Sequence, residues 1–249
     1  MNNVRAINFF LPIIICLGLG SCVLYDDEAY DLSNFNVDDV IVNVTPSRSL
    51  VSANGLDTTS IVVELPIEAD TVTVSIETNL GTFVSSGTQK FSGTSYRRSM
   101  GGTNKHLVEA QLKAGADAGK AIIQVQVAGF QERVEVEFAR NYPNEISVTP
   151  SKIGVVRGFG NEIELSIALL APVGMVSNNH PIEVTATDSA QNSIGNFRVR
   201  PGSYSLNSAN AVFSVAPDTS YVGPIHILVN TQGDASPLNH EIIIYSLDH

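Results

Sequence analysis

The chain contains no tryptophan and only two cysteines, and aromatic residues make up 7% of its 249 residues. Cys16 and Cys22 both lie near the N-terminus, so the rest of the chain has no thiol for a disulfide or a zinc site. Such a body depends on its own apolar core for stability. Valine, isoleucine, threonine and serine are frequent, and this composition favours β-strands over helices.

Basic residues are scarce as well. The chain has 14 lysines and arginines against 25 aspartates and glutamates, which gives a formal net charge of −11. An acidic surface of this kind repels the phosphates of nucleic acids and the head groups of anionic lipids. We therefore predict that nucleic acid is not a partner.

The apolar stretch at the N-terminus is too short to span a membrane. Residues 6–19 fall below the ~20 apolar residues that a spanning helix needs, and Asn8 and Pro12 interrupt them. Residues 1–5 before this stretch carry one positive charge and no acidic residue. A basic start followed by a short apolar core is typical of a secretory signal peptide, and we predict that residues 1–21 are cleaved.

Leu19-Gly20-Ser21-Cys22 closes the apolar stretch and resembles the lipobox of bacterial lipoproteins, an aliphatic residue and two small residues before a cysteine. The resemblance implies that Cys22 carries a diacylglyceryl group, usually with an N-acyl chain, and that the protein contacts the outer membrane through this lipid. A single acyl chain binds a membrane with K of only about 10⁴ M⁻¹, so stable anchoring needs more than one. The alternative is an ordinary signal peptide with an unrelated cysteine.

Residues 22–39 form an acidic segment without a basic residue. Its acidic residues are Asp26, Asp27, Glu28, Asp31, Asp38 and Asp39. The segment has no sustained period, so we interpret it as an extended linker between the anchor and the body. The cluster Asp26-Asp27-Glu28 resembles an acidic surface-export signal of lipoproteins in some Gram-negative bacteria, which implies exposure at the cell surface. The alternative is that these acids only keep the linker soluble.

A five-residue motif occurs twice in the remaining chain. Val44-Thr45-Pro46-Ser47-Arg48 recurs as Val148-Thr149-Pro150-Ser151-Lys152, at an offset of 104 residues (from 44 to 148). A period near one hundred residues with short strands is typical of tandem β-sandwiches. Proline has no backbone N–H, so we predict that the strand breaks at each proline and changes its partner. We expect two modules, at residues 40–140 and 144–249.

Both modules show the alternation of apolar and polar residues that half-buried strands require. We predict strands at residues 40–44, 60–65, 72–76, 107–112, 123–127 and 134–138 in the first module, and at 146–148, 153–156, 163–169, 182–187, 197–200, 211–215, 225–229 and 242–245 in the second. The composition of residues 188–192 and 232–239 predicts loops. The fold class is therefore all-β, with two tandem sandwiches.

The segment Ala53–Ile61 resembles the opening of the immunoglobulin-like repeats in intimin- and invasin-type bacterial adhesins. The likeness continues through Asn79–Phe83, Ala114-Gly115 and Gly119–Val125, and it covers about residues 40–138. It implies an immunoglobulin-like sandwich that serves as a spacer or display module. The second module opens with the same five-residue motif, and we expect it to be a second immunoglobulin-like sandwich.

The sequence contains no motif for catalysis or metal binding. Residues 115–120 are one residue short of a phosphate-binding loop, and Ala121 replaces the hydroxyl residue that would hold magnesium, so we interpret this segment as a turn. The histidines form no metal pair at helical or hairpin spacing. We predict His226 in the core or on a sheet face, and His180 and His240 in solvent. No Ser-His-Asp order or nucleophile elbow is present, and we predict no enzymatic activity, cofactor or metal.

Basic residues gather in one part of this acidic chain. The candidate binding residues are Lys90, Tyr96, Arg97, Arg98, Lys105 and His106. Glycines lie among them, and two interpretations are open. One is a mobile basic loop that receives an anionic glycan or an acidic protein. The favoured one is a solvated hairpin whose charges simply face water. A second candidate, the apolar loop at residues 171–177, is predicted either to dock on a partner or to pack on its own sandwich.

Together these features favour a non-enzymatic, surface-exposed lipoprotein of the outer membrane that acts in adhesion, display or assembly of an envelope complex. The alternative is a carbohydrate-capture lipoprotein of a polysaccharide-uptake system. The lack of tryptophan counts against it because sugar platforms stack on exposed aromatic rings, for which Tyr96, Tyr204 and Tyr221 are the candidates. A third hypothesis is an enzyme accessory domain in the periplasm.

Overall fold

A computed structural model describes residues 40–66, 72–100, 102–158, 160–194, 198–200 and 210–248. The predicted signal peptide, Cys22 and the acidic linker lie outside these residues, as does Tyr204. In the part of the chain that is described, no helix is long and apolar enough to cross a membrane. All described strands belong to one compact unit, residues 36–249.

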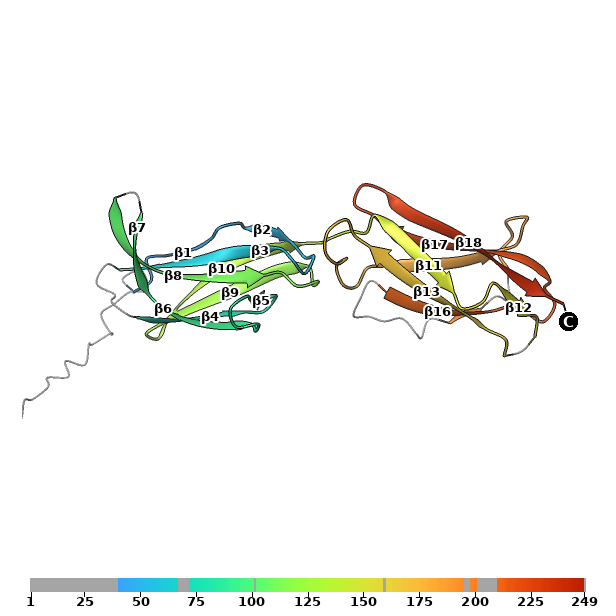
Figure 1. Cartoon of the computed structure of the whole chain (residues 1–249), viewed down its shortest axis with the longest axis horizontal. Helices are drawn as coiled ribbons and strands as arrows, with labels where there is room; N and C mark the ends of the chain where they lie inside the picture. Colours follow the sequence, from blue (N-terminus) through green and yellow to red (C-terminus); the bar gives the residue numbers. More distant parts are fainter. Residues whose placement is uncertain are drawn as a thin grey trace, which may run out of the picture. The chain divides into compact units, whose positions relative to one another are not determined.

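The first ten strands form two sheets, drawn in blue to green in Figure 1. One sheet has the order β1 (Asn43–Pro46), β3 (Thr58–Leu65), β8 (Thr103–Lys113), β5 (Thr82–Phe83), with β7 (Tyr96–Met100) also paired to β8. The other has the order β2 (Leu50–Ser52), β10 (Phe130–Ala139), β9 (Gly119–Val127), β4 (Thr73–Thr78), β6 (Lys90–Thr94). We call these two sheets the first sandwich.

The core of the first sandwich lies between its two sheets. Alternate residues of β3 and β9 point inward, as the sequence pattern predicts, and Ile61 and Ile123 are fully buried. Phe83 and Phe138 fill the same cluster from β5 and β10. Full burial of such side chains contributes ~1.5–3 kcal/mol each, and this core contains no disulfide.

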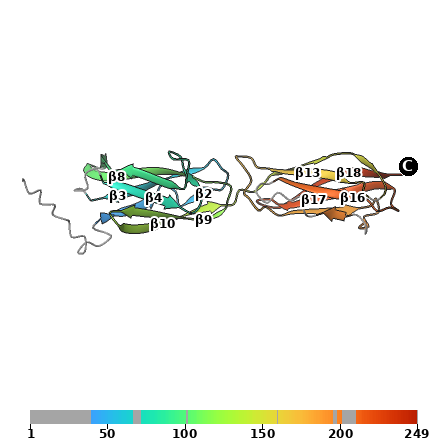
Figure 2. The same cartoon turned by 90° about the horizontal axis from the view of Figure 1, so that it is seen from below.

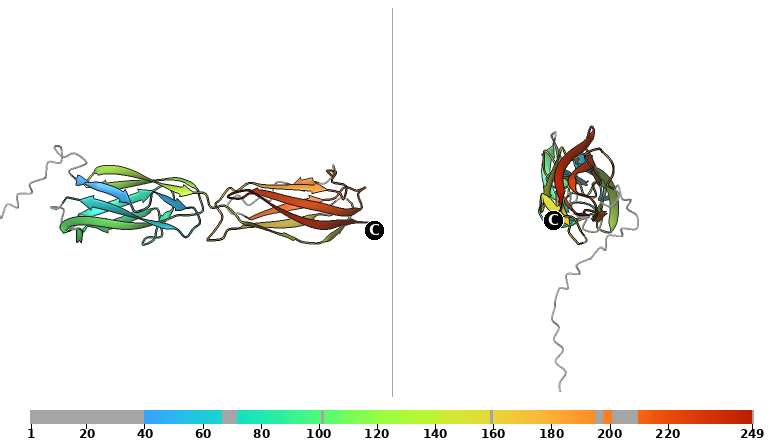
Figure 3. Two further views of the ribbon diagram at one scale, coloured as in Figure 1. Left: turned by 90° about the horizontal axis from the view of Figure 1, so that it is seen from above. Right: turned by 90° about the vertical axis from the view of Figure 1, so that its right-hand side faces the viewer.

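The remaining eight strands form a second pair of sheets, drawn in yellow to red in Figure 1, which we call the second sandwich. One sheet has the order β11 (Glu145–Pro150), β13 (Ile163–Leu170), β16 (Asn210–Ala216), β15 (Arg198–Arg200). The other has the order β12 (Gly154–Val156), β18 (Pro237–Leu247), β17 (Gly223–Gln232), β14 (Ile182–Thr187). Ile163, Leu165, Ile225 and Ile227 are fully buried in its separate core. Figures 2 and 3 show the two-layered arrangement of strands from further directions.

The chain changes sheets directly after each proline of the repeated motif. β1 pairs antiparallel with β3 up to Pro46, and β2 then pairs parallel with β10 in the opposite sheet. In the second sandwich, β11 pairs with β13 up to Pro150, and β12 pairs parallel with β18. The prediction that the strand breaks at proline and changes its partner is therefore confirmed in both copies.

The structure corrects one predicted loop and leaves the module boundaries as predictions. Residues 232–239 were expected to form a loop, but β17 runs to Gln232 and β18 begins at Pro237. A tight turn suffices between them, because the Gly233 N–H donates to the Ser236 carbonyl at 3.1 Å. The other predicted loop, at residues 188–192, is a turn in which the Asp188 carboxylate accepts two backbone N–H groups. Between the sandwiches, β10 ends at Ala139 and β11 begins at Glu145.

Candidate functional site

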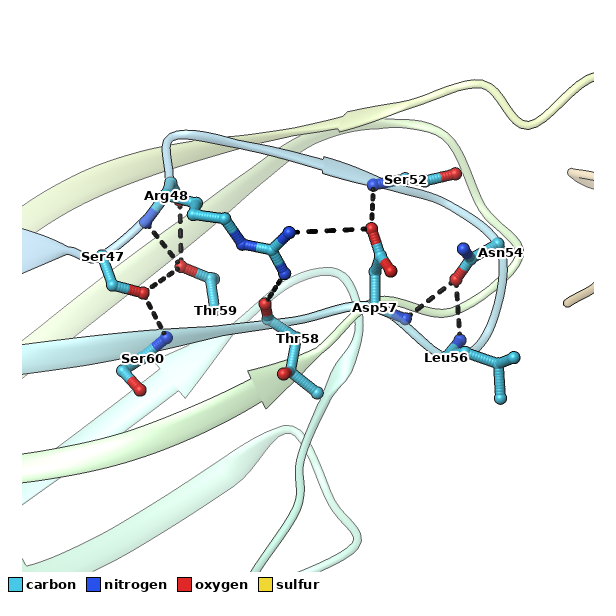
Figure 4. Close-up of polar contacts among 9 residues, drawn as sticks. All are labelled: Ser47, Arg48, Ser52, Asn54, Leu56, Asp57, Thr58, Thr59 and Ser60. Atoms are coloured by element: carbon cyan, nitrogen blue, oxygen red, sulfur yellow. Dashed lines mark hydrogen bonds and ion pairs between the residues drawn. The ribbon is translucent and has the colours of Figure 1, made fainter. Parts of the chain in front are cut away.

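A polar network follows β1 at the point where the chain leaves its first sheet (Figure 4). The Ser47 N–H donates to the Ser60 carbonyl at 2.8 Å, and the Ser60 N–H donates to Ser47 Oγ at 2.9 Å. Arg48 makes a similar pair with the buried Thr59: its N–H donates to Thr59 Oγ1 at 3.0 Å, and that hydroxyl donates to the Arg48 carbonyl at 2.9 Å. These bonds satisfy the backbone N–H and carbonyl groups around Ser47 and Arg48, where β1 has ended and β2 has not yet begun.

A second part of the network shapes the turn after β2 (Figure 4). Asn54 Oδ1 accepts the N–H groups of Leu56 and Asp57, both at 2.8 Å. Asp57 Oδ2 in turn accepts the Ser52 N–H at 3.1 Å. Gly55 has φ of +75°, a conformation that glycine adopts without strain. The residues that carry the resemblance to adhesin repeats therefore act in folding, as a strand change and a turn.

The second sandwich repeats the central part of this network. The Ser151 N–H donates to the Glu164 carbonyl at 2.8 Å, and the Glu164 N–H donates to Ser151 Oγ at 3.0 Å. Asn161 Nδ2 donates to the Val156 carbonyl at 3.0 Å, which ties the following turn to β12. The serine of the repeated motif thus has the same role in both sandwiches.

The segment forms a hairpin, as the favoured interpretation expects, and not a mobile loop, because it is built from paired strands. Lys90 opens β6, Tyr96–Met100 is β7, and Lys105 and His106 belong to β8. The chain crosses from one sheet to the other at Ser95, whose hydroxyl accepts the Val72 N–H at 3.0 Å. Along β7 and the first residues of β8, polar side chains follow one another without apolar residues at alternate positions. The sequence pattern therefore did not mark these residues as strands.

The hairpin of β7 and β8 brings five of the six candidate residues together. Arg97 lies opposite His106, and Arg98 lies opposite Lys105. Tyr96 is the neighbour of Arg97 in β7, whereas Lys90 lies in the other sheet.

Three of the candidate cations have acidic neighbours. Lys90 Nζ lies 2.7 Å from Glu77, Lys105 Nζ lies 2.7 Å from Glu64, and an Arg98 nitrogen lies 3.7 Å from Glu109. His106 is buried, with 2% of its surface exposed. Of the candidate residues in the hairpin, Tyr96 and Arg97 are exposed and form no ion pair within the described part of the chain. A binding role for this surface stays a prediction.

The three histidines considered in the second module lie in different environments, and His240 is partly exposed on β18. His226 lies on the outer face of β17, and its Nδ1 is 2.6 Å from a Glu241 oxygen, so the predicted position on a sheet face is confirmed. The prediction of a solvated His180 is wrong, since this ring is 2% exposed and its Nε2 contacts the Gln232 carbonyl at 2.6 Å. Burial lowers the pKa of His180, and nearby Arg140 lowers it further against the effect of that carbonyl.

The apolar loop at residues 171–177 has two sets of contacts. Val176 is buried in the core of the second sandwich. Its neighbours instead contact the first sandwich: the Met175 N–H donates to the Asn54 carbonyl at 2.8 Å, and Ser177 Oγ donates to the Ala53 carbonyl at 3.0 Å. A β-carbon on Gly174 would lie 2.3 Å from the Asn54 oxygen, so only glycine fits this approach.

Asparagines that the sequence analysis did not single out complete this contact. The Asn178 N–H donates to the Ala116 carbonyl at 2.8 Å, and its Nδ2 donates to Asp117 at 2.9 Å. Asn141 Nδ2 donates to the Met175 carbonyl at 2.7 Å. Arg140 Nη1 reaches the Asn178 carbonyl at 3.2 Å. No periodic signal in the sequence marks these residues, because each bonds to backbone or to a distant loop.

No cluster of described residues points to catalysis. No group of three or more histidine, cysteine, aspartate or glutamate side chains could hold a metal ion in the described ranges. The glycine-rich segment at residues 115–120 joins β8 to β9 and contains no helix, in agreement with its interpretation as a turn. Its Lys120 lies 3.0 Å from Glu135, and this hydrogen bond raises the pKa of the lysine.

Comparisons with known proteins identify the fold. Neither the protein-family models nor the curated proteins contain a match to the chain. Among solved structures, it is similar to the Yersinia pseudotuberculosis adhesin InvE (TM-score 0.52, 15% identity, 84% of this chain covered). It is also similar to invasin, a bacterial integrin-binding protein (TM-score 0.57, 12% identity, 83% covered). The matches span 61% and 39% of those two chains. The predicted all-β fold, with immunoglobulin-like domains of the invasin type, is confirmed.

Proposed function

We propose, from the fold that this chain shares with invasin-type adhesins, that it is a non-enzymatic, surface-exposed lipoprotein of the bacterial outer membrane. Its role is adhesion, display or assembly of an envelope complex. The observation that carries this proposal is the all-β fold, which is similar to the fold of the adhesin InvE and of invasin, a bacterial integrin-binding protein. The residues that the sequence shares with such repeats act in folding, which fits a module that presents a surface and does no chemistry.

The proposed lipid anchor is supported by the amino-acid sequence near the N-terminus. Leu19-Gly20-Ser21-Cys22 supplies the lipid attachment site, and the acidic residues after Cys22 supply the export signal. A lipid at Cys22 would hold the sandwiches at the envelope, and export across the outer membrane would expose them to other cells.

Two measurements test this proposal. Cys22→Ala is expected to move the protein from the membrane fraction to the soluble fraction, because the lipid is then missing. Protease treatment of intact cells is expected to remove the wild-type protein. Persistence of Cys22→Ala in the membrane fraction contradicts the anchor, and protection of the wild-type protein in intact cells contradicts surface exposure.

Carbohydrate capture is the second candidate function, and one observation favours it. Tyr96 is 45% exposed on β7, and an exposed aromatic ring suits stacking on a sugar. Tyr221 is less suited, because its hydroxyl already donates to the Pro224 carbonyl at 2.6 Å. Binding to a glycan array that Tyr96→Ala abolishes and Tyr221→Phe leaves intact would favour this function over adhesion to protein.

A further inference from the structure

Met175 is the methionine whose side-chain surroundings the structure describes. Met1, Cys16 and Cys22 lie outside the described residues, and so does the side chain of Met100. The Met175 side chain is 55% exposed, although it belongs to the loop at residues 171–177 that contacts the first sandwich. Its thioether is therefore accessible to reagents in solution.

The backbone of Met175 is held at both of its polar groups. Its N–H donates to the Asn54 carbonyl of the first sandwich at 2.8 Å. Its carbonyl accepts Asn141 Nδ2 at 2.7 Å, from the segment between the two sandwiches. Gly174 packs so closely before it that a β-carbon there would lie 2.3 Å from the Asn54 oxygen. The backbone of Met175 therefore has little room to shift while this contact is intact.

The side chain of Met175 lies against the turn at residues 54–56, whose hydrogen bonds Figure 4 shows. A β-carbon on Gly55 would be 2.4 Å from the terminal methyl carbon of Met175 and 3.8 Å from its sulfur. The lack of a side chain at Gly55 therefore makes room for the methionine. In this way one methyl group joins a side chain of the second sandwich to the backbone of the first.

The residues that follow Met175 extend the same contact. The hydroxyl of the buried Ser177 donates to the Ala53 carbonyl at 3.0 Å. The Asn178 N–H donates to the Ala116 carbonyl at 2.8 Å. Because these donors lie shortly after Met175 in the chain, a shift of its backbone moves them as well. The position of the Met175 side chain is thus coupled to the hydrogen bonds between the sandwiches.

A thioether in such a place can be oxidised by a hydroperoxide. The sulfur attacks one oxygen of hydrogen peroxide, so that an S–O bond forms as the O–O bond breaks. The other oxygen leaves as water after taking the proton of the transferred oxygen, and the electron pair that the sulfur loses is gained by the peroxide. The product, methionine sulfoxide, is polar and chiral, whereas the thioether is flexible and apolar.

The sulfoxide fits the contact with Gly55 poorly. Its oxygen is attached to an atom that already lies beside this glycine, and the polar S–O group is hydrated best when it turns towards water. The terminal methyl group then leaves the glycine. Losing the burial of one apolar carbon shifts an opening equilibrium by about fourfold.

We propose that Met175 is an oxidation site that controls the contact between the two sandwiches. A hydroperoxide converts the thioether to the sulfoxide, and the loop at residues 171–177 then releases the turn at residues 54–56 more often. The modified atom is exposed, while the backbone that it moves is held by the hydrogen bonds described above. This inference does not depend on the proposed function.

Peroxide treatment of the purified full chain in a nonionic detergent, followed by mass spectrometry of its peptides, tests the site. We expect one oxygen atom to be added to Met175 at a rate close to that of N-acetylmethionine in the same solution, because the thioether is exposed. A Met175 that stays unmodified while N-acetylmethionine is oxidised overturns the proposal.

Hydrogen exchange measured by NMR before and after oxidation tests the consequence. We expect the Met175 and Asn178 amides to exchange about fourfold faster in the oxidised chain, the factor for losing the burial of one apolar carbon. The Ser151 amide, which donates to the Glu164 carbonyl within the second sandwich, should keep its rate. Methionine sulfoxide reductase with dithiothreitol, which releases the oxygen as water and leaves the dithiothreitol as a disulfide, should restore the original rates.

Two variants assign the effect to one residue. Met175→Leu keeps an apolar side chain without sulfur, so peroxide should leave its exchange rates unchanged. Met100→Leu is the matched control and should respond to peroxide like the wild type. Oxidation of Met175 without faster exchange at either amide overturns the proposal, and so does a response to peroxide that persists in Met175→Leu.

Discussion

The two sandwiches begin with the same strand change but stabilise it differently. In both, the serine after the proline exchanges two hydrogen bonds with the facing strand: Ser47 with Ser60, and Ser151 with Glu164. The first sandwich adds a buried threonine, Thr59, where the second has the fully buried Ile163. Both sandwiches thus use the same pair of hydrogen bonds between the serine and the facing strand. The neighbouring buried position differs: it holds a hydrogen-bonded hydroxyl in one sandwich and an apolar side chain in the other.

The turn after the second strand differs in the same way. Asp57 accepts a backbone N–H, whereas its equivalent Asn161 donates to a backbone carbonyl. The first turn also receives the loop at residues 171–177 through the Asn54 carbonyl. The side chains at these equivalent positions can thus differ, one accepting and one donating a hydrogen bond, as long as each buried polar group has a partner.

Exchanging the buried residue should have the largest effect. Ile163→Thr introduces a hydroxyl into an apolar site and removes buried methyl groups, and we expect it to destabilise the chain by about 3 kcal/mol. Urea unfolding monitored by circular dichroism measures this loss. Ile163→Val is the control, with an expected loss of about 1 kcal/mol. Equal losses for the two variants would contradict the cost assigned to the hydroxyl.

Blocking the covered turn should have the next largest effect. Gly174→Ala places a β-carbon against the Asn54 carbonyl at a residue with φ of +68°, and we expect a loss of about 2 kcal/mol. Hydrogen exchange at the Met175 amide, which donates to that carbonyl, should become faster. Gly160→Ala is the matched control, since Gly160 has φ of +83° but open space around it, and only the backbone cost of about 1 kcal/mol applies. Protected exchange at Met175 in Gly174→Ala would contradict the contact.

Removing the shared serine should affect both sandwiches alike. Ser47→Ala and Ser151→Ala each delete the hydroxyl acceptor of one backbone N–H, and we expect each to cost about 1 kcal/mol. Denaturant unfolding of the two variants and of the double variant gives the values. The sites are in different cores, so the losses should add. A loss confined to one variant would show that the two strand changes are not equivalent.

The smallest expected effect is on the pH dependence of stability. The folded-state pKa of His180 is lowered by burial, so the unfolded chain binds a proton at this residue more readily. The stability that depends on neutral His180 is present above the ordinary pKa of 6.5 and is lost as the pH falls below it towards the lower folded-state pKa. His180→Gln should reduce the fall in melting temperature between about pH 7 and pH 5. An unchanged slope would contradict this prediction, and His240→Gln serves as the control.

The strands and the change of sheet could be predicted from the sequence, because both depend on local features. Alternation marks β3 and β9, and proline marks the breaks at Pro46 and Pro150. Residues 107–112 of β8 alternate and were predicted as a strand, whereas β7 and the first residues of β8 were not, since these residues are polar and lack apolar alternation. Burial of His180 and the role of Asn178 were missed because they depend on segments far apart in sequence, Gln232 and Ala116.

The parallel pairing of β2 with β10 has a mechanical consequence. The chain enters the first sandwich through β1, continues into β2 and leaves through β10, and β2 and β10, as adjacent parallel strands pulled from opposite ends, slide along one another. The Ala53–Ala139 and Glu137–Ser49 hydrogen bonds are then stretched together and not one after another. β12 and β18 repeat this geometry. Under tension along the chain, each sandwich therefore yields by shear, the loading mode in which a few hydrogen bonds resist the greatest force.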